Sequence, residues 1–473
     1  MAMIIIRSIL DFYLSIIPIY CISSLISAFF RFNLAERIWT NSLDRFFSYT
    51  ATIFKEESKE ENSDSSIQDD DLLRKDSNDH TSAYESNLIR RDVCLTEDGM
   101  KTSQRFICDA NTRFKLHHPV YLAKAGIESI IEDDVTRRFT AAELKVWNFL
   151  SRNPSYAFLN KDHNFLVNFL WIIGFFIRYF MLFPCRIFVF LSSFIIAIIA
   201  GILIIISPNK SLKSFFRQTM YSSAMRYHLR SYSTYVRFHN IENQPKFNSI
   251  CVANHTTPLD YVLLCADIPY SIIGQKHSGL FGFSEKIIGY AIPSVWFDRS
   301  EILDRNITAK KLHNHILEEY APPLLVFPEG TCINNTSVMK FKKGSFEVNA
   351  PFYPVAIKYD PRFSDCFWNS NNDSLFQYLI NLMTSWAVVV DIWYLDVEHK
   401  GENEDSISFA RRIRQSIAKK GALDDMEWDG DLKRKFVGPN LRHKQQEVFS
   451  QTFITEIVEN ASEQSAIDEK KDQ

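Results

Sequence analysis

Residues 249–266 read Ser-Ile-Cys-Val-Ala-Asn-His-Thr-Thr-Pro-Leu-Asp-Tyr-Val-Leu-Leu-Cys-Ala, and this stretch indicates the fold class. Ser249–Ala253 is a short apolar run, which predicts a buried strand. Proline is favoured in the first turn of a helix, so Pro258–Ala266 is predicted to be helical. The polar residues between them lie where the chain leaves the predicted strand.

The same alternation of strands and helices continues from about Tyr232 to Asp396. Six further strands are predicted at Thr234–Phe238, Ser271–Gly274, Ser294–Phe297, Leu324–Phe327, Pro354–Tyr359 and Val388–Tyr394. Further helices are predicted at Gly279–Ala291, Asp304–Tyr320 and Ser406–Lys420. This order is typical of an α/β sandwich around a largely parallel sheet, and we expect residues 232–436 to form that domain.

The N-terminal region, residues 1–55, contains an uncharged apolar run over residues 12–30. Its length matches the thickness of one bilayer, so it predicts a membrane segment or an interfacial anchor. A cleaved signal peptide is the alternative. It is disfavoured because the apolar run exceeds the usual core length and no small-x-small cleavage site follows it.

A second apolar region covers residues 165–206 and is interrupted by Asn168, Arg178 and the Pro184-Cys185-Arg186 triplet. We predict a membrane hairpin that turns at Pro184, with Arg178 reaching toward the nearer interface. The alternative is a buried helical pair in a soluble domain, which such continuous apolarity disfavours. Residues 207–231 mix cations with aromatic residues and predict a basic amphipathic segment at the membrane surface.

Three other regions complete the predicted organisation. Residues 56–92 are acidic and polar with almost no large apolar side chains, which predicts a disordered linker. Residues 93–164 are predicted to be a small helical region, with a Thr-x-x-Glu capping box at Thr140. Residues 437–473 form a polar tail.

Composition narrows the possible functions. A formal net charge of −3 over 473 residues gives no reason to expect a nucleic-acid partner. The eight cysteines are scattered without Cys-x-x-Cys pairs or an adjacent His doublet, which argues against a zinc site and indicates free thiols in a reducing cytosol. We expect neither a metal nor a cofactor, and the sequence does not indicate an oligomeric state.

Four short blocks carry the chemistry: Asn254–Asp260, Trp296–Arg299, Phe327–Thr331 and Pro354–Ile357. In the first, the Asp260 carboxylate can reach back to His255 from the first turn of the predicted helix. It would then hold one ring N–H and leave the other nitrogen free to act as a general base. The chain has 12 histidines, so the spacing alone carries little weight, and the pair could instead cap the helix.

The second block places Phe297 and Arg299 at the end of a predicted strand, where an arginine suits a phosphate. Asp298 or Glu301 could instead pair with that guanidinium at the surface.

The third block ends another strand in a turn that is constrained by Pro328 and relieved by Gly330. There Glu329 could hold substrate hydroxyls or pair with Arg299, and Thr331 follows it in the turn. The block could equally be an ordinary turn. The fourth block has no reactive group, and we expect Pro354 and its neighbours to floor the site. Together the blocks supply the groups needed to move an acyl group onto an alcohol.

In this order and wording the four blocks resemble the glycerolipid acyltransferase superfamily. Gly274–Leu280, Val295–Glu301, Phe327–Ser337 and Pro354–Tyr359 look like the microsomal glycerol-3-phosphate acyltransferases of animals. The similarity extends to Trp428-Asp429-Gly430. It does not include the acidic linker or the last thirty or so residues.

The resemblance implies an acyltransferase-type α/β fold and acyl transfer from acyl-CoA to the sn-1 hydroxyl of glycerol 3-phosphate. Carried onto this chain, it makes His255 the base and Asp260 its orienting residue. It also places Phe297, Arg299, Glu329, Gly330, Thr331 and Pro354 at the substrate. It implies an endoplasmic reticulum membrane protein in contact with membrane lipid, with the catalytic domain facing the cytosol.

Several alternatives stay open. The acceptor could be lysophosphatidate or another lysophospholipid, and a catalytically inactive lipid-binding scaffold is a more remote possibility. A serine or cysteine hydrolase has only Cys332 in its favour, because the chain lacks a Gly-x-Ser-x-Gly elbow. The terminal Lys470-Lys471-Asp472-Gln473 resembles a dilysine retrieval signal, which acts on a cytosolic tail.

Overall fold

The computed structural model describes residues 2–64, 135–140, 165–275, 292–297, 305–318 and 320–433, together with His443 and Glu447. The chain divides into two compact units. One unit comprises Met1–Ser48 and Glu132–Pro439, and it contains both the sheet and the long apolar helices. The predicted helix at 279–291, the linker beyond residue 64, most of 93–164 and nearly all of the tail lie outside the described residues.

A seven-stranded sheet forms the centre of the first unit, in the order β1-β8-β7-β2-β5-β3-β4. The strands are β1 (Tyr235–His239), β2 (Ile250–Ala253), β3 (Ser271–Gln275), β4 (Val295–Phe297), β5 (Leu324–Val326), β7 (Phe352–Tyr359) and β8 (Val389–Tyr394). All neighbouring strands are parallel except β7 and β8. The predicted, largely parallel sheet is therefore confirmed, and each of its seven strands overlaps a predicted one.

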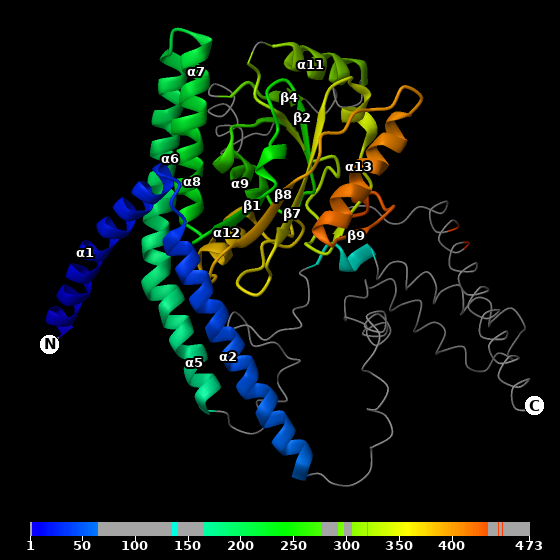
Figure 1. Cartoon of the computed structure of the whole chain (residues 1–473). Helices are drawn as coiled ribbons and strands as arrows, with labels where there is room; N and C mark the ends of the chain where they lie inside the picture. Colours follow the sequence, from blue (N-terminus) through cyan, green and yellow to red (C-terminus); the bar gives the residue numbers. More distant parts are fainter. Residues whose placement is uncertain are drawn as a thin grey trace, which may run out of the picture. The chain divides into compact units, whose positions relative to one another are not determined.

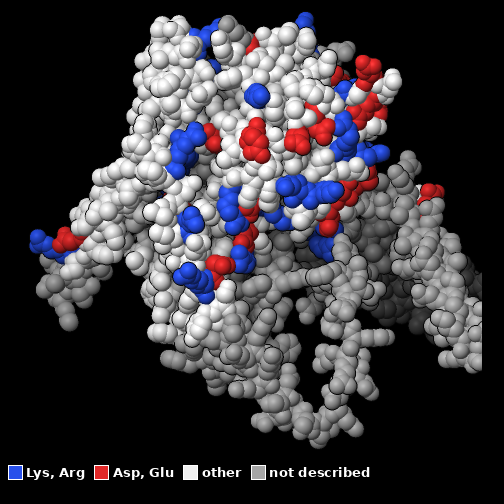
Figure 2. All heavy atoms as spheres, viewed as in Figure 1, with Lys and Arg blue, Asp and Glu red and all other residues white. Residues whose placement is uncertain are grey.

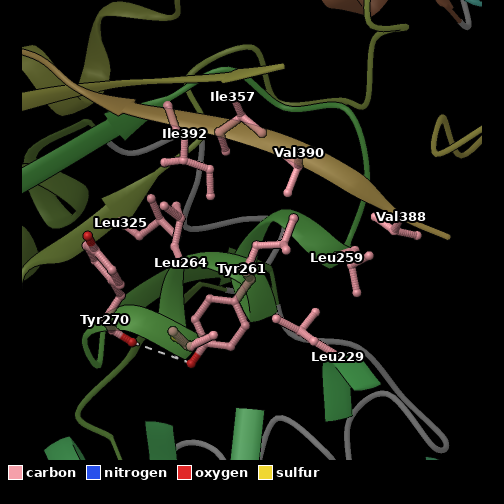
Figure 3. Close-up of a cluster of buried hydrophobic side chains, with 14 of the residues drawn as sticks. Leu229, Leu259, Tyr261, Leu264, Tyr270, Leu325, Ile357, Val388, Val390 and Ile392 are labelled. Atoms are coloured by element: carbon pink, nitrogen blue, oxygen red, sulfur yellow. Dashed lines mark hydrogen bonds between the residues drawn. The ribbon is translucent and has the colours of Figure 1, made fainter. Parts of the chain in front are cut away.

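Helices cover both faces of this sheet (Figure 1). One face packs against α9 (Leu259–Asp267), α8 (Ser222–Arg230) and α12 (Leu375–Met383), and the other against α11 (Arg305–Leu317) and α13 (Ser406–Gly421). Side chains of successive residues along a strand point to opposite faces of the sheet. Cys251 and Ala253 of β2 face α9, whereas Ile250 and Val252 face α13. Figure 3 shows the α9 side, where Leu264 packs against Leu325 and Ile357.

The sequence did not predict α12 or the short parallel pair of β6 (Ser337–Val338) and β9 (Asp424–Asp425). Helix α12 follows an Asn-rich loop and begins at a capping residue, since the Ser374 side chain accepts a hydrogen bond from Gln377 N. β6 and β9 have two residues each, which is too short for an alternation of apolar and polar side chains to be visible.

Two helices precede the predicted linker. α1 (Ala2–Phe29) contains the first predicted membrane segment, and α2 (Leu34–Asp64) follows after a short turn. The end of α2 includes residues 56–64, which were predicted to be disordered. This stretch is rich in Glu and Lys, which favour a helix even without a core to pack against.

The predicted hairpin at residues 165–206 is wrong. The chain instead runs as one continuous helical segment: α5 (Phe165–Phe176), the π-helical turn η3 (Ile177–Leu182) and α6 (Phe183–Ile206). Pro184 lies in the first turn of α6, where a missing backbone N–H costs little, and the wider π-helical turn precedes it. At about 1.5 Å per residue, the 38 residues from Phe169 to Ile206 exceed the hydrocarbon thickness of a bilayer.

The two arginines of this segment bind the α/β domain. Arg178 Nη1 donates to Thr384 O at 3.1 Å, and Arg186 donates to the carbonyls of Met383 and Ser385 at 2.6 Å and of Trp386 at 2.8 Å. Both side chains are buried. The carbonyl oxygens of residues 383–386, at the end of α12 and just after it, thus bind both arginines, and Arg178 is buried against the α/β domain.

The segment predicted to lie on lipid is folded against other helices. It forms α7 (Lys210–Phe216), the π-helical turn η4 (Arg217–Tyr221) and α8. Arg226 donates to Ala28 O and Ala266 O, both at 2.6 Å. Arg230 forms a 3.0 Å ion pair with Glu36 and is buried. These two arginines join α1 and α2 to α8 and α9, so the prediction of lipid contact is wrong for them.

Within the part of the chain that the structure describes, two helical segments are long and apolar enough to cross a membrane, Leu10–Phe29 and Phe169–Ile206. Both expose large apolar side chains, among them Leu14, Ile22, Phe194, Ile198 and Ile202. On the face of the α/β domain seen in Figure 2, Lys and Arg are interspersed with Asp and Glu and do not form a patch of one sign. The exposed apolar side chains of the helices favour a membrane partner, and the face seen in Figure 2 shows no basic footprint for nucleic acid.

Replacing Arg186 by Ala tests the anchoring of α6. Three buried carbonyl groups would lose their donor, so we expect the free energy of unfolding to fall by about 2–4 kcal/mol. Thermal unfolding of the detergent-solubilised full chain measures this. Arg45→Ala, at an exposed position of α2, is the control. Equal melting temperatures for the two variants would contradict the anchoring role.

Candidate active site

The first and third blocks meet at the carboxyl ends of adjacent parallel strands. Val252 of β2 pairs with Val326 of β5, so His255 and Phe327–Thr331 follow neighbouring strands at the same edge of the sheet. In open α/β sheets this edge is where ligands bind. The sheet therefore brings together the two blocks with the most reactive side chains.

His255 and Asp260 form the predicted pair. His255 Nδ1 lies 3.0 Å from Asp260 Oδ2, which also accepts hydrogen bonds from the backbone N–H groups of Thr256 at 2.8 Å and Thr257 at 3.0 Å. Asp260 Oδ1 accepts a hydrogen bond from Tyr359 Oη at 2.5 Å. Asp260 is fully buried in the first turn of α9, so it is a fixed acceptor that leaves His255 Nε2 as the reactive nitrogen.

The His255 ring is held on its face and at its second nitrogen. Phe327 stacks on the ring with 4.2 Å between centroids, and Cys332 Sγ lies 3.4 Å from Nε2. The side chain retains 19% of its exposure. His255 is thus oriented by three neighbours and remains partly exposed.

Charge interactions raise the basicity of His255. Burial lowers the pKa of the imidazole, whereas the neighbouring Cys332 and the Asp260 carboxylate raise it. The raising interactions dominate, so the pKa of His255 lies well above its ordinary value of 6.5. A histidine in this state takes a proton more readily than a free imidazole does.

Glu329 has partners different from those expected. Its Oε1 accepts from His255 N at 2.8 Å and its Oε2 from Met339 N at 3.0 Å, and the side chain is 1% exposed. Burial raises the pKa of Glu329 to about 8 even though both N–H groups favour its ionised form. In this structure Glu329 fixes the backbone of His255, while its predicted contact with substrate hydroxyls stays a prediction.

The turn after Glu329 depends on glycine at two positions. Gly330 has φ +71°, in the left-handed region that was expected from the sequence, and it is exposed. Gly430 packs against the same turn, because a Cβ there would lie 2.8 Å from both Glu329 O and Thr331 Cγ2. Thr331 is half-buried beneath this contact. The turn is therefore packed against Gly430, a residue that lies outside the four blocks.

The structure describes only part of the second block. Phe297 ends β4, where it pairs with Gln275 of β3, and its side chain lies outside the described residues. Arg299 lies outside them as well. β4 is three strands away from β2 in the sheet order. The predicted phosphate contact of Arg299 therefore stays a prediction.

The fourth block lies on the other side of β2. Pro354 is buried in β7 and pairs with Val252, and the Asn254 side chain exchanges two hydrogen bonds with the backbone of Ile357, at 2.9 and 2.8 Å. Asn254 is buried, so a glycan on the Asn254-His255-Thr256 sequon is incompatible with this fold. Block four thus supports the strand and loop that carry His255.

Two site residues were missed or undervalued. Tyr359 lies two positions after Ile357 on β7, and the period of two in a strand would have placed it on the same face as α9 and Asp260. Cys332 was noted only as weak support for a hydrolase, because its approach to His255 depends on the conformation of the turn. The arrangement of His255, Asp260, Tyr359 and Cys332 suits a general base that takes a hydroxyl proton at His255 Nε2.

Comparison with known proteins identifies the family of the chain. The family model described as "Acyltransferase" matches residues 235–358. Glycerol-3-phosphate acyltransferase 4 of Homo sapiens is 39% identical over 376 residues, covering 78% of this chain and 82% of its own length. Glycerol-3-phosphate acyltransferase 3 of Xenopus laevis is 42% identical over 344 residues, covering 72% and 76%.

One solved structure is also similar. The 1-acyl-sn-glycerophosphate acyltransferase PlsC from Thermotoga maritima is 15% identical, with a TM-score of 0.35, over 56% of this chain and 98% of its own. The sequence relatives, matched over most of their length, are sufficient to assign the family. The chain belongs to the glycerol-3-phosphate acyltransferase family.

Proposed function

We propose that this protein transfers the acyl group of acyl-CoA to the sn-1 hydroxyl of glycerol 3-phosphate and makes lysophosphatidate, a precursor of phospholipids and triacylglycerol. The observation that carries the proposal is the His255–Asp260 pair, buried on one side and reachable on the other, in a chain about 40% identical to glycerol-3-phosphate acyltransferases. Substrate contacts by Phe297, Arg299, Glu329, Gly330, Thr331 and Pro354 belong to the same proposal.

The reaction needs no covalent enzyme intermediate. His255 Nε2 takes the proton of the acceptor hydroxyl while the oxygen attacks the thioester carbonyl carbon. The carbon–sulfur bond then breaks, and the CoA thiolate leaves and receives the proton from the imidazolium. Asp260 stabilises that imidazolium through Nδ1, and four hydrogen bonds keep the carboxylate in place.

The proposed location is the endoplasmic reticulum membrane with the site facing the cytosol. Two helices long enough to cross a membrane support membrane association, and long-chain acyl-CoA partitions at such a surface. The cysteines that the structure describes are all free thiols, which suits a reducing compartment.

An acceptor panel tests the proposed function. Membrane-bound enzyme is given labelled acyl-CoA with glycerol 3-phosphate, lysophosphatidate or another lysophospholipid, and wild type is compared with His255→Ala. We expect wild type to prefer glycerol 3-phosphate and the variant to lose at least about 100-fold in kcat, because the base is gone. Preference for lysophosphatidate would reject the acceptor, and equal rates in both proteins would reject the mechanism.

Cys332 favours a second mechanism that can be tested separately. Its sulfur, His255 and Asp260 are arranged like the nucleophile, base and orienting group of a cysteine acyl-enzyme. Direct transfer predicts that Cys332→Ser retains kcat within about fivefold and that acyl-CoA alone leaves no label on the protein. Stoichiometric labelling of wild type that disappears in the variant would establish the covalent route instead.

A natural glycosylation sequon tests the orientation. Asn372-Asp373-Ser374 lies in an exposed loop before α12, and it would be an acceptor if the domain were in the lumen. We expect peptide N-glycosidase to leave the mobility of the cellular protein unchanged. A shift that Asn372→Gln abolishes would contradict the cytosolic orientation.

A further inference from the structure

A segment outside the matched family region packs against the candidate active site. The family model ends at residue 358, whereas Trp428–Lys433, which we call the closing segment, follows α13. It lies about 100 residues after Glu329 in the chain, yet it contacts Glu329, Thr331 and Cys332 of the Phe327–Cys332 turn. The four blocks therefore do not contain everything that shapes the site.

The first half of the closing segment fixes the front of the turn. Trp428 O accepts from Lys340 N at 2.9 Å. Gly430 lies so close to Glu329 O that no side chain fits there. Asp431 pairs with Lys342 Nζ at 2.9 Å, and Lys342 N in turn donates to Pro328 O at 2.9 Å. The closing segment therefore contacts the backbone of Glu329, whereas His255 N binds its side chain.

Lys433 ends the segment in a buried position, with an exposed fraction of 7%. Its ammonium donates to Cys332 O at 3.3 Å and to Trp368 O at 3.5 Å, and it lies 5.1 Å from the ring centroid of Phe367. Both carbonyls belong to loops that contact the His255 region. Cys332 Sγ contacts His255 Nε2, and Trp368 N donates to Thr256 O at 3.5 Å.

We propose that Lys433 is a positioning residue for the acyl-transfer reaction, and that the closing segment is part of the active site. One ammonium joins the loops on the two sides of His255, namely the turn at Cys332 and the loop at Trp368. Charge-assisted bonds to two carbonyls hold that spacing more firmly than neutral contacts would. Misplacing reacting groups by about 1 Å lowers the rate by about 100-fold, so loss of the ammonium should act on turnover.

The test separates turnover from binding in the full-length, membrane-bound protein. Lys433→Met keeps an unbranched side chain and removes the charge. We expect kcat to fall at least about tenfold, with KM for acyl-CoA and for the acceptor within about twofold. Lys433→Arg retains a cation and should recover at least half of the loss on a logarithmic scale. Lys419→Met, an exposed lysine of α13, is the control with unchanged kinetics.

Asn371→Ala probes the same contact if Lys433→Met does not fold. Asn371 Nδ2 donates to Lys433 O at 3.1 Å from an exposed loop, so its removal loosens the segment without leaving a buried charge. We expect a fall in kcat of about threefold with an unchanged melting temperature. A wild-type kcat in Lys433→Met overturns the proposal. If Lys433→Met does not fold, a wild-type kcat in Asn371→Ala overturns it instead. So does an increase in KM alone, because it would make Lys433 a binding residue.

This inference rests on the proposed function, and the assay keeps the two apart. Every variant is measured with the acceptor that wild type acylates fastest. A wild type that prefers another acceptor corrects the proposed function and leaves the comparison among variants intact. A wild type that acylates glycerol 3-phosphate while Lys433→Met matches it rejects only the role of Lys433.

Discussion

The site depends on one buried carboxylate. Asp260 is removed from water in the first turn of α9, where a charge without partners would be costly. Its two oxygens instead receive four hydrogen bonds, from His255, two backbone N–H groups and Tyr359. These bonds fix the loop from Asn254 to Pro258 and determine which imidazole nitrogen is reactive. The orientation of the base and its position relative to α9 therefore depend on the satisfaction of this one group.

Buried cations play the corresponding role at the junction of the apolar helices and the α/β domain. Arg186 and Arg178 bind backbone carbonyls after α12, and Arg226 and Arg230 bind α1, α9 and the turn before α2. Helix α12 is also tied to the site, because Tyr378 Oη hydrogen-bonds the Thr257 side chain. The helices that are apolar enough for a membrane are thus connected through hydrogen bonds to the loop of His255.

The sheet could be predicted because its signals are local. Each strand is a short apolar run next to Gly, Pro or polar residues, and His255 and Gly330 follow strand ends that a parallel sheet brings to one edge, with Asp260 in the helix that comes next after His255. The hairpin was predicted wrongly because the contacts that decide its structure are not local in the sequence. Pro184 and Arg178 look like a break and a misplaced charge until their surroundings are known, and the partners of Arg186 are about 200 residues away.

The roles of Glu329 and Tyr359 were also not predictable from the sequence, because they depend on partners that only the fold brings close. A carboxylate in a turn looks available to substrate, and only the fold shows that His255 N and Met339 N bind both of its oxygens. The contacts of Gly430 and Lys433 were equally invisible, since they come from a segment joined to the site only in space. Roles that arise from side-chain chemistry were predictable, whereas roles that arise from burial and distant partners were not.

The pH dependence of kcat/KM in wild type and Asp260→Asn tests the central claim most directly. His255 acts as a base only when it is deprotonated, so the rate should rise with pH through the pKa of His255. Because the neighbouring Cys332 and the Asp260 carboxylate raise the pKa of His255 above its ordinary value, the wild-type midpoint should lie above pH 6.5, and the Asp260→Asn midpoint should be lower because the contribution of the carboxylate is lost. Comparing the two proteins with the same acceptor cancels the ionisation of the acceptor phosphate. Identical midpoints in the two proteins would contradict the assignment of His255 and Asp260 as base and orienting residue.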